Sequence, residues 1–193
     1  DGDIGTFLVT ALVLCAGGAV LWYPVRNIRR ELRLRDGFLV VALFWAMLGL
    51  GGAIPFLLGP TVHLSFTDAV FESVAGVTTT NASVVLGLDR LSHALLWYRQ
   101  QLQWLGGIGV IVLAVALFPI LGIGGMQLYR GDSPGSVKDE KLTPRIKETA
   151  RTLSGIYLLV TIACALAFNI AGMSPFDAVT HAFSTVSTGG FST

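Results

Sequence analysis

Two segments of this 193-residue chain each join a short apolar stretch to a turn of hydroxyl, amide and glycine residues. They cover residues 65–82 and 174–191 and align without a gap, at an offset of 109 residues (174 − 65). Their turns, Thr78–Asn81 and Ser187–Gly190, supply backbone carbonyl and hydroxyl oxygens but no formal charge. Uncharged oxygen ligands suit a monovalent alkali cation, because a divalent cation usually recruits carboxylates. We therefore interpret the two turns as parts of a cation filter.

Each segment is expected to begin with a short helix that enters a membrane only part of the way. Both open with the pattern Ser-x-x-Asp, at Ser65 to Asp68 and at Ser174 to Asp177, which satisfies the orphan N–H groups of a helix start. A helix of about 10–12 residues spans roughly 15–18 Å, whereas the hydrocarbon core is about 30 Å thick. Its C-terminal end carries a partial negative charge that favours a cation. Irregular backbone at this depth is tolerated where it lines a watery path, so the pattern predicts two pore loops.

The predicted filter takes four residues from each turn. They are Thr78, Thr79, Thr80 and Asn81 in the first turn, and Ser187, Thr188, Gly189 and Gly190 in the second. Asn81 aligns with Gly190, at a place where carbonyl-lined filters need backbone that glycine adopts freely, often with φ above zero. Asn is the non-glycine residue that best tolerates this conformation. We expect the substitution to preserve the backbone and to add a side chain beside the ion path.

Three charged or titratable residues near the filter have two interpretations each. Glu72 and His181 occupy equivalent positions in the two predicted helices, where they either tune the outer mouth or pack behind the helix. Arg99 lies in the next apolar run, as either a snorkelling residue at its outer end or an intramembrane charge near the pathway. Spacing along the sequence does not choose between these interpretations.

The composition is that of an all-α membrane protein that crosses the bilayer several times. Hydrophobic residues make up 53% and charged residues 13%, with a mean hydropathy of +0.69, whereas soluble domains carry about 25% charged residues. All but two of the 13 Lys and Arg fall in two windows, residues 26–35 and 130–151. The positive-inside rule places both windows in the cytoplasm. They are short and lack interleaved aromatic residues, so a nucleic-acid partner is not predicted.

Apolar runs of sufficient length predict membrane spans of alternating direction. They are Ile4–Val25, Phe38–Leu58, Leu91–Leu121 and Leu153–Ala171. With the basic windows inside, both pore loops enter from the outside. A break is expected near Gly122–Gly125 at the inner end of the third span, followed by a basic loop over residues 129–151.

Together these features resemble the membrane subunit of the Trk/Ktr/HKT superfamily of potassium transporters, and most closely its TrkH-type branch. The stretches that carry the resemblance are Asp68–Asn81, Gln103–Leu113, Gly124–Arg130, Lys141–Arg145 and His181–Ser192. The resemblance implies repeated membrane helix–pore loop–membrane helix units, four in one chain, around a pseudo-fourfold ion pore. Residues 1–36 would then form a leading transmembrane helix and a cytoplasmic basic linker. Residues 37–130 would form the first repeat, and residues 131–193 a cytoplasmic loop and an incomplete second repeat, so that the chain is part of a longer protein.

The resemblance also implies the transported ion and the partners. Potassium is expected at the backbone carbonyls of Thr79, Thr80, Thr188 and Gly189, with no organic cofactor in this chain. The family forms homodimers in the bacterial inner membrane and binds a cytosolic nucleotide-sensing ring of the TrkA type, which would face the basic windows. Asn81 departs from the family's glycine, and in plant HKT relatives a non-glycine residue in the first filter accompanies sodium permeation. A sodium-permeable cation transporter of the same superfamily is therefore an open alternative.

Other functional classes fit the residues less well. No H-E-x-x-H or Walker motif is present, and His63, His93 and His181 are scattered, so an enzyme is not predicted. An ion-coupled symporter of another fold would show broken helices in inverted repeats. The two units here point the same way, which disfavours that alternative.

Overall fold

The computed structural model describes residues 2–27, 34–62, 64–120 and 139–193. Every regular element within these ranges is helical. In chain order they are α1 (Gly2–Trp22), α2 (Leu34–Gly52), α3 (Ile54–Leu58), α4 (Phe66–Val77), the 3₁₀ turn η1 (Leu88–Arg90), α5 (His93–Ile120), α6 (Asp139–Ile170) and α7 (Pro175–Val186). The predicted all-α architecture is confirmed.

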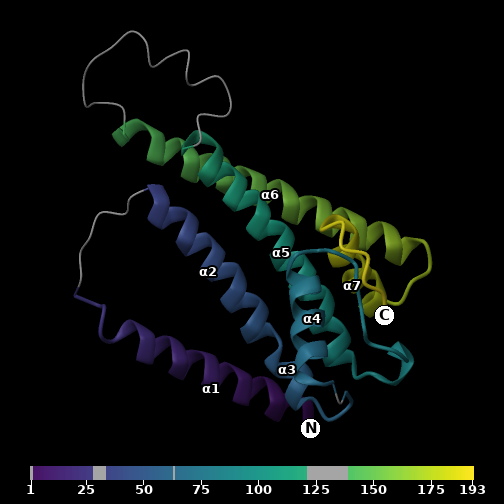
Figure 1. The fold of residues 1–193 in the computed structure, drawn as a ribbon. Coiled ribbons are helices and arrows are strands. Elements are labelled where there is room, and N and C mark those ends of the chain that lie inside the picture. The colour runs from purple at the N-terminus through teal and green to yellow at the C-terminus, as the bar shows by residue number, and fades with distance from the viewer. Residues whose placement is uncertain (1, 28–33, 63, 121–138) are drawn as a thin grey trace.

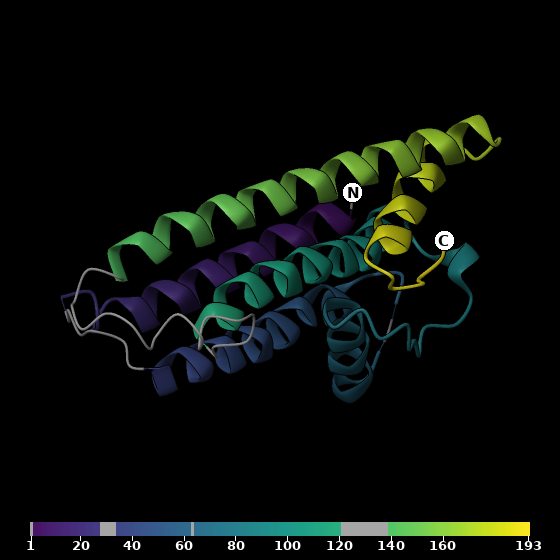
Figure 2. The ribbon, with the colours of Figure 1, turned by 90° about the horizontal axis from the view of Figure 1, so that it is seen from above.

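The two pore-loop helices lie near one end of the long helices (Figure 1). α5 and α6 run side by side, and α4 and α7 lie near the same end of the molecule, on opposite sides of α5 (Figure 2). Both α4 and α7 contact α5. Each has 12 residues, which corresponds to about 18 Å of helix. The two predicted short helices are therefore present, and α5 is the element that they share.

Three of the predicted spans have the length and composition that crossing a bilayer requires. In the described part of the chain they are Asp3–Trp22, Phe38–Leu58 and Glu148–Ile170, with hydropathies of 2.2, 2.1 and 2.0. Many large apolar side chains of these segments are exposed in this chain, as expected for surfaces that face lipid or neighbouring helices. The protein is an all-α membrane protein.

The third predicted span corresponds to α5, which differs from the other spans in its polar first half. It has 28 residues, or roughly 42 Å of helix. Its first half carries Arg99, Gln100 and Gln103, whose exposed fractions are 1%, 0% and 0%. Arg99 pairs with Glu72 of α4, and Gln103 accepts a hydrogen bond from the segment after α7. This half of the helix is polar because it packs against the two pore loops.

Two predicted elements differ from the structure. The span Phe38–Leu58 has its predicted ends, but it is not one continuous helix: it breaks at Ala53 and resumes as α3 with Pro55 in its first turn, because proline has no N–H and its ring clashes with the carbonyl four residues earlier. The loop predicted over residues 129–151 is helical from Asp139 onward. Glu, Lys and Arg are good helix formers, so a run of charged residues does not by itself indicate a loop.

Some predictions fall outside the described residues. They are the break at Gly122–Gly125, the stretch Gly124–Arg130, and the basic residues Arg29, Arg30, Arg33, Arg130 and Lys138.

Two glycines let α5 approach the C-terminal ends of both pore-loop helices. A Cβ atom on Gly106 would overlap the carbonyl of Val77, the last residue of α4. A Cβ atom on Gly107 would overlap the hydroxyl of Tyr157 and lie 3.2 Å from the Cβ of Ser187, the C-cap of α7. Small residues are needed where helix backbones come this close. The two glycines therefore set the position at which each filter segment begins.

We expect Gly106→Ala to destabilise the protein by about 1–3 kcal/mol, the usual cost of overpacking, because the new methyl group meets backbone that cannot rotate away. The matched control is Gly155→Ala in the middle of α6, where a Cβ would meet nothing within 4 Å. Alanine is favoured over glycine in a helix by up to about 1 kcal/mol, so the control should be neutral or stabilising. The apparent Tm of the purified protein in detergent measures both, and equal Tm values for the two variants would contradict the packing argument.

Candidate ion-binding filter

The two pore-loop helices begin in the same way. Ser65 Oγ accepts a hydrogen bond from the N–H of Asp68 at 3.2 Å, and Ser174 Oγ accepts one from the N–H of Asp177 at 3.1 Å. Each Ser hydroxyl donates in turn to the Asp carboxylate at 2.7 Å. The predicted caps are confirmed. They satisfy the helix N-terminus, where the carboxylate also interacts favourably with the helix dipole.

The two helices also end in the same way, in a Schellman motif. In α4, the N–H of Thr80 bonds to the carbonyl of Ala75 and the N–H of Thr79 to that of Gly76, both at 3.0 Å. The same two bonds recur 109 residues later (184 − 75), from Gly189 to Ser184 at 2.8 Å and from Thr188 to Thr185 at 3.0 Å. These bonds satisfy two backbone carbonyls in the last turn of each helix. The backbone that follows the two helices therefore starts in the same direction relative to each helix.

The residues after each helix alternate in the sign of φ. Thr79 and Asn81 have φ values of 55° and 61°, and the equivalent Thr188 and Gly190 have 58° and 81°. The residue between the members of each pair is not in the positive region. Successive carbonyls of a regular strand point to opposite sides, whereas a carbonyl-lined filter needs them on one side. The alternation permits that arrangement, and the expectation that Asn81 adopts a glycine-like backbone is confirmed.

Two of these left-handed positions hold threonine. A β-branched residue at positive φ is a genuine outlier, and such strain costs on the order of 1–3 kcal/mol. Helices that end in a Schellman motif usually place glycine there. Strain of this kind persists where the surrounding structure imposes it, and it is concentrated at functional sites. The strained turns are therefore candidates for a functional site.

A buried ion pair supports the first turn from behind. Arg99 of α5 donates to Glu72 Oε1 through Nη2 at 2.7 Å and through Nε at 2.9 Å, and the two side chains are only 2% and 0% exposed. Ser83 donates to both carboxylate oxygens at 3.0 Å and accepts from Arg99 at 2.9 Å, and the N–H of Val84 donates to Glu72 at 3.0 Å. Glu72 therefore packs behind the helix, and Arg99 is buried inside the protein rather than extended to an interface as a snorkelling side chain.

The same helix also holds the second turn. The guanidinium of Arg99 lies over the ring of Phe191, 4.5 Å from its centroid, in a cation–π contact. Gln103 Oε1 accepts a hydrogen bond from the N–H of Phe191 at 3.2 Å. A Cβ atom on Gly189 would overlap the Gln103 carboxamide, so this position has no room for a side chain. One face of α5 thus fixes the backbone that follows both pore-loop helices.

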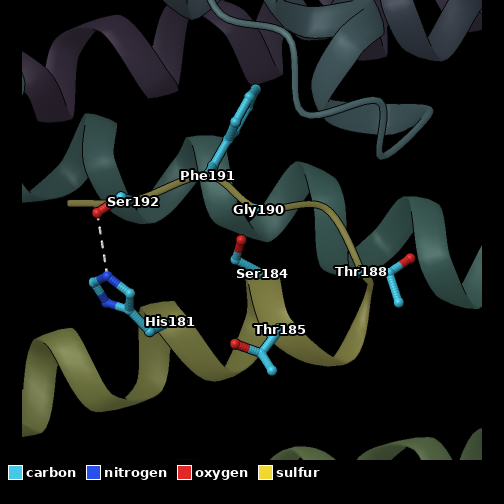
Figure 3. Close-up of a pocket in the computed structure, with 7 residues that line it drawn as sticks. All are labelled: His181, Ser184, Thr185, Thr188, Gly190, Phe191 and Ser192. Atoms are coloured by element: carbon cyan, nitrogen blue, oxygen red, sulfur yellow. Dashed lines mark hydrogen bonds between the residues drawn. The ribbon is translucent and has the colours of Figure 1, made fainter.

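The second pore-loop helix carries His181 at the position equivalent to Glu72. His181 Nε2 lies 3.3 Å from Ser192 Oγ, and its Nδ1 lies 2.9 Å from the carbonyl of Asp177. Ser192 is the equivalent of Ser83, so both pore-loop helices hold the serine that follows their filter turn. Figure 3 shows His181 and Ser192 facing each other, while Phe191 points away from α7. A cavity of about 350 Å³ lies between α7 and the turn.

Asp177 ties the end of the second segment to the start of its helix. Hydrogen bonds from Ser174 and then Thr193, the latter at 2.8 Å, lower the pKa of its carboxyl group. Because the pKa of Asp177 is lower in the folded state, these hydrogen bonds stabilise the fold at pH values above the ordinary pKa of Asp. The stabilisation is lost as the pH falls through the lowered value.

The structure brings the two predicted turns together. The side chain of Asn81 lies against Gly189 and Gly190 of the second turn. The hydroxyls of the two C-cap residues bond back to their own helices, Thr78 to Val74 at 2.7 Å and Ser187 to Ser184 at 3.1 Å. Ser187 and Gly189 are buried, whereas the other predicted filter residues are exposed or partly exposed in this chain. Backbone carbonyls, more than the capping hydroxyls, are therefore the groups available for a cation.

Sequence reasoning missed the supporting roles of Ser83 and Gln103. The matching serines, Ser83 and Ser192, were visible in the alignment of the two segments. No comparable signal pointed to Gln103, because its contact with Phe191 joins residues 88 positions apart. Among the described residues, no group of three or more His, Cys, Asp or Glu side chains could hold a metal ion.

Comparison with known proteins places these features in one group. The sequence model of the TrkH family, described as a cation transport protein, matches residues 5–193. The Trk system potassium uptake proteins TrkH of Vibrio parahaemolyticus and Escherichia coli K12 are 58% and 56% identical over the whole chain, which spans 40% of each. The crystal structure of the potassium transporter TrkH from Vibrio parahaemolyticus matches with a TM-score of 0.84 and 53% identity, over 100% of this chain and 38% of that one.

We expect Glu72→Ala to destabilise the protein by about 3–5 kcal/mol, because it leaves the Arg99 guanidinium buried without its carboxylate. Combining Glu72→Gln with Arg99→Met removes both charges at similar volume and should cost clearly less than Glu72→Ala alone. Apparent Tm values for these variants, and for Glu72→Gln and Arg99→Met alone, complete the comparison. A double variant as unstable as the sum of its single changes would show that the ion pair contributes no coupling.

Proposed function

The chain belongs to the TrkH family of cation transport proteins, and we propose that it contributes two pore loops to a potassium-conducting membrane protein. It spans about 40% of the length of the curated relatives that it matches, so the activity proposed is that of the full-length protein. The observation that carries the proposal is the shared backbone of Thr78–Asn81 and Ser187–Gly190. Both follow 12-residue helices, and both alternate in the sign of φ.

The mechanism follows from the helix ends and the carbonyls. Potassium sheds part of its hydration shell where uncharged carbonyls of the two turns replace water. The proposed ligands are the carbonyls of Thr79, Thr80, Thr188 and Gly189, with Asn81 and Gly190 beside them. The partial negative charge at the C-terminal ends of α4 and α7 favours a cation at this point. No carboxylate lies in either turn, so the ion is held weakly enough to leave.

The wider assembly is part of the same proposal. Residues 37–130 form the first repeat, and residues 131–193 begin the second, after a leading helix and linker over residues 1–36. The protein lies in the bacterial inner membrane, with both pore loops entering from the periplasmic side and the basic windows in the cytoplasm. A homodimer and a cytosolic ring of the TrkA type, docked on the basic windows, are the partners that the family resemblance supports. Co-purification of the full-length protein with such a ring tests this part.

A second candidate is a transporter that also passes sodium. Asn81 supports it, because this residue puts a side chain where the second turn has only Gly190. Reversal potentials of the full-length protein under bi-ionic potassium and sodium conditions decide between the two candidates. Equal permeability favours the second candidate, and a strong preference for potassium favours the first.

We expect Gly190→Ala to lower potassium uptake by the full-length protein by at least about tenfold, since a pore ligand is displaced. Gly190 has a φ of 81°, and a Cβ atom there would lie 2.5 Å from Cγ of Asn81. Rubidium uptake by potassium-depleted cells measures the effect, normalised to the amount of protein in the membrane.

The matched control is Gly172→Ala, in the turn between α6 and α7. Gly172 also has positive φ, at 103°, but a Cβ atom there meets nothing within 4 Å. Both variants carry backbone strain, whereas only one alters the filter. Uptake should persist in Gly172→Ala, and equal uptake by the two variants would count against a filter at Gly190.

A further inference from the structure

Asn81 contacts the second turn through its side chain. With the carboxamide oriented to satisfy its neighbours, the amide nitrogen donates to the carbonyl of Gly190 at 3.0 Å and to that of Gly189 at 3.1 Å. The opposite orientation sets the amide oxygen against the same two carbonyl oxygens, which repel it. The nitrogen therefore faces the carbonyls when no ion lies between them.

The contact joins two turns that otherwise have equivalent backbones. Gly190, the counterpart of Asn81, has no side chain, so the second turn makes no equivalent hydrogen bond to the first turn. The left-handed backbone at φ 61° directs the Asn81 side chain toward the neighbouring turn. Asn81 is exposed in this chain, so burial alone does not impose the contact. The two hydrogen bonds are what hold the carboxamide in place.

The acceptors of these bonds are groups of the filter itself. Gly189 is one of the proposed potassium ligands, and Gly190 follows it directly. A carbonyl oxygen has two lone pairs, so a donor and an ion can share it. The amide hydrogens nevertheless carry positive partial charge, which opposes a cation at the same oxygens. A cation that enters between the turns must therefore compete with the carboxamide.

We propose that the Asn81 carboxamide is a built-in competitor for the cation, which bonds to the Gly189 and Gly190 carbonyls and lowers the apparent affinity of the filter. This inference rests on the proposed function and adds a residue that sets the strength of ion binding. It differs from a steric or backbone effect of Asn81, because it depends on the two N–H groups.

Two variants of the full-length protein separate the donor from the backbone. Asn81→Gly removes the carboxamide and keeps a residue suited to positive φ. Asn81→Asp keeps the shape, and Asp also tolerates the left-handed region. It has no N–H to donate, but its negative charge also attracts a cation, so a fall in this variant counts as support only together with a fall in Asn81→Gly. Both should lower the half-saturating potassium concentration for uptake by about fivefold or more, the order expected when one or two net hydrogen bonds no longer compete.

A binding measurement accompanies the transport assay. Potassium should raise the apparent Tm of both variants at lower concentrations than it does for the wild type, with choline as the inert cation. The matched control is Asn169→Asp, the same chemical change on an exposed residue of α6, which should leave half-saturation unchanged.

The outcomes are distinct. Unchanged half-saturation in Asn81→Gly overturns the inference. A fall in Asn81→Gly without one in Asn81→Asp also overturns it, because backbone relaxation would then be the cause. If the wild-type protein takes up no potassium or rubidium at all, the proposed function fails. A working wild type with identical variants means that only the competitor role fails.

Discussion

The buried guanidinium of Arg99 is the constraint on which both pore loops depend. A charge removed from water costs several kcal/mol unless it is paired and hydrogen-bonded. Glu72 and Ser83 supply that pairing from the first repeat, and the ring of Phe191 covers the guanidinium from the second. The ion pair and the hydrogen bonds of Arg99 thus come from the first segment, and its cation–π contact comes from the second. The energetic requirement of one side chain therefore links two turns that are far apart in the sequence.

The repeat conserves geometry more strictly than chemistry. Both helices start after an N-cap serine and end in a Schellman motif, and the residues that follow alternate in the sign of φ in the same way. Behind the turns, a carboxylate at position 72 is replaced by an imidazole at position 181, yet each contacts the serine that follows its turn. In the turns, Asn81 faces Gly190. The backbone is the shared framework, and differences between the repeats lie in the side chains.

Strain and close packing explain why the turns hold their shape. Thr79 and Thr188 adopt a conformation that costs free energy for a β-branched residue. Gly106 and Gly107 bring α5 against the ends of both helices, and Gln103 bonds to the backbone of the second segment. These contacts hold both turns against α5. A strained backbone can then persist, because relaxation would break packing and hydrogen bonds elsewhere.

The sequence by itself determined the helical membrane class, the paired pore loops, their serine caps and the equivalence of Asn81 and Gly190. These features follow from local composition and from a repeat that can be aligned residue by residue. The sequence did not predict the break at Ala53 or the helix before Arg151, since neither hydropathy nor charge reports backbone geometry. Only the tertiary structure decided that Arg99 is buried against Glu72 and that Asn81 donates to the opposite turn. Such contacts join residues that are distant in the chain, and their free energy depends on desolvation and distance, which no local pattern contains.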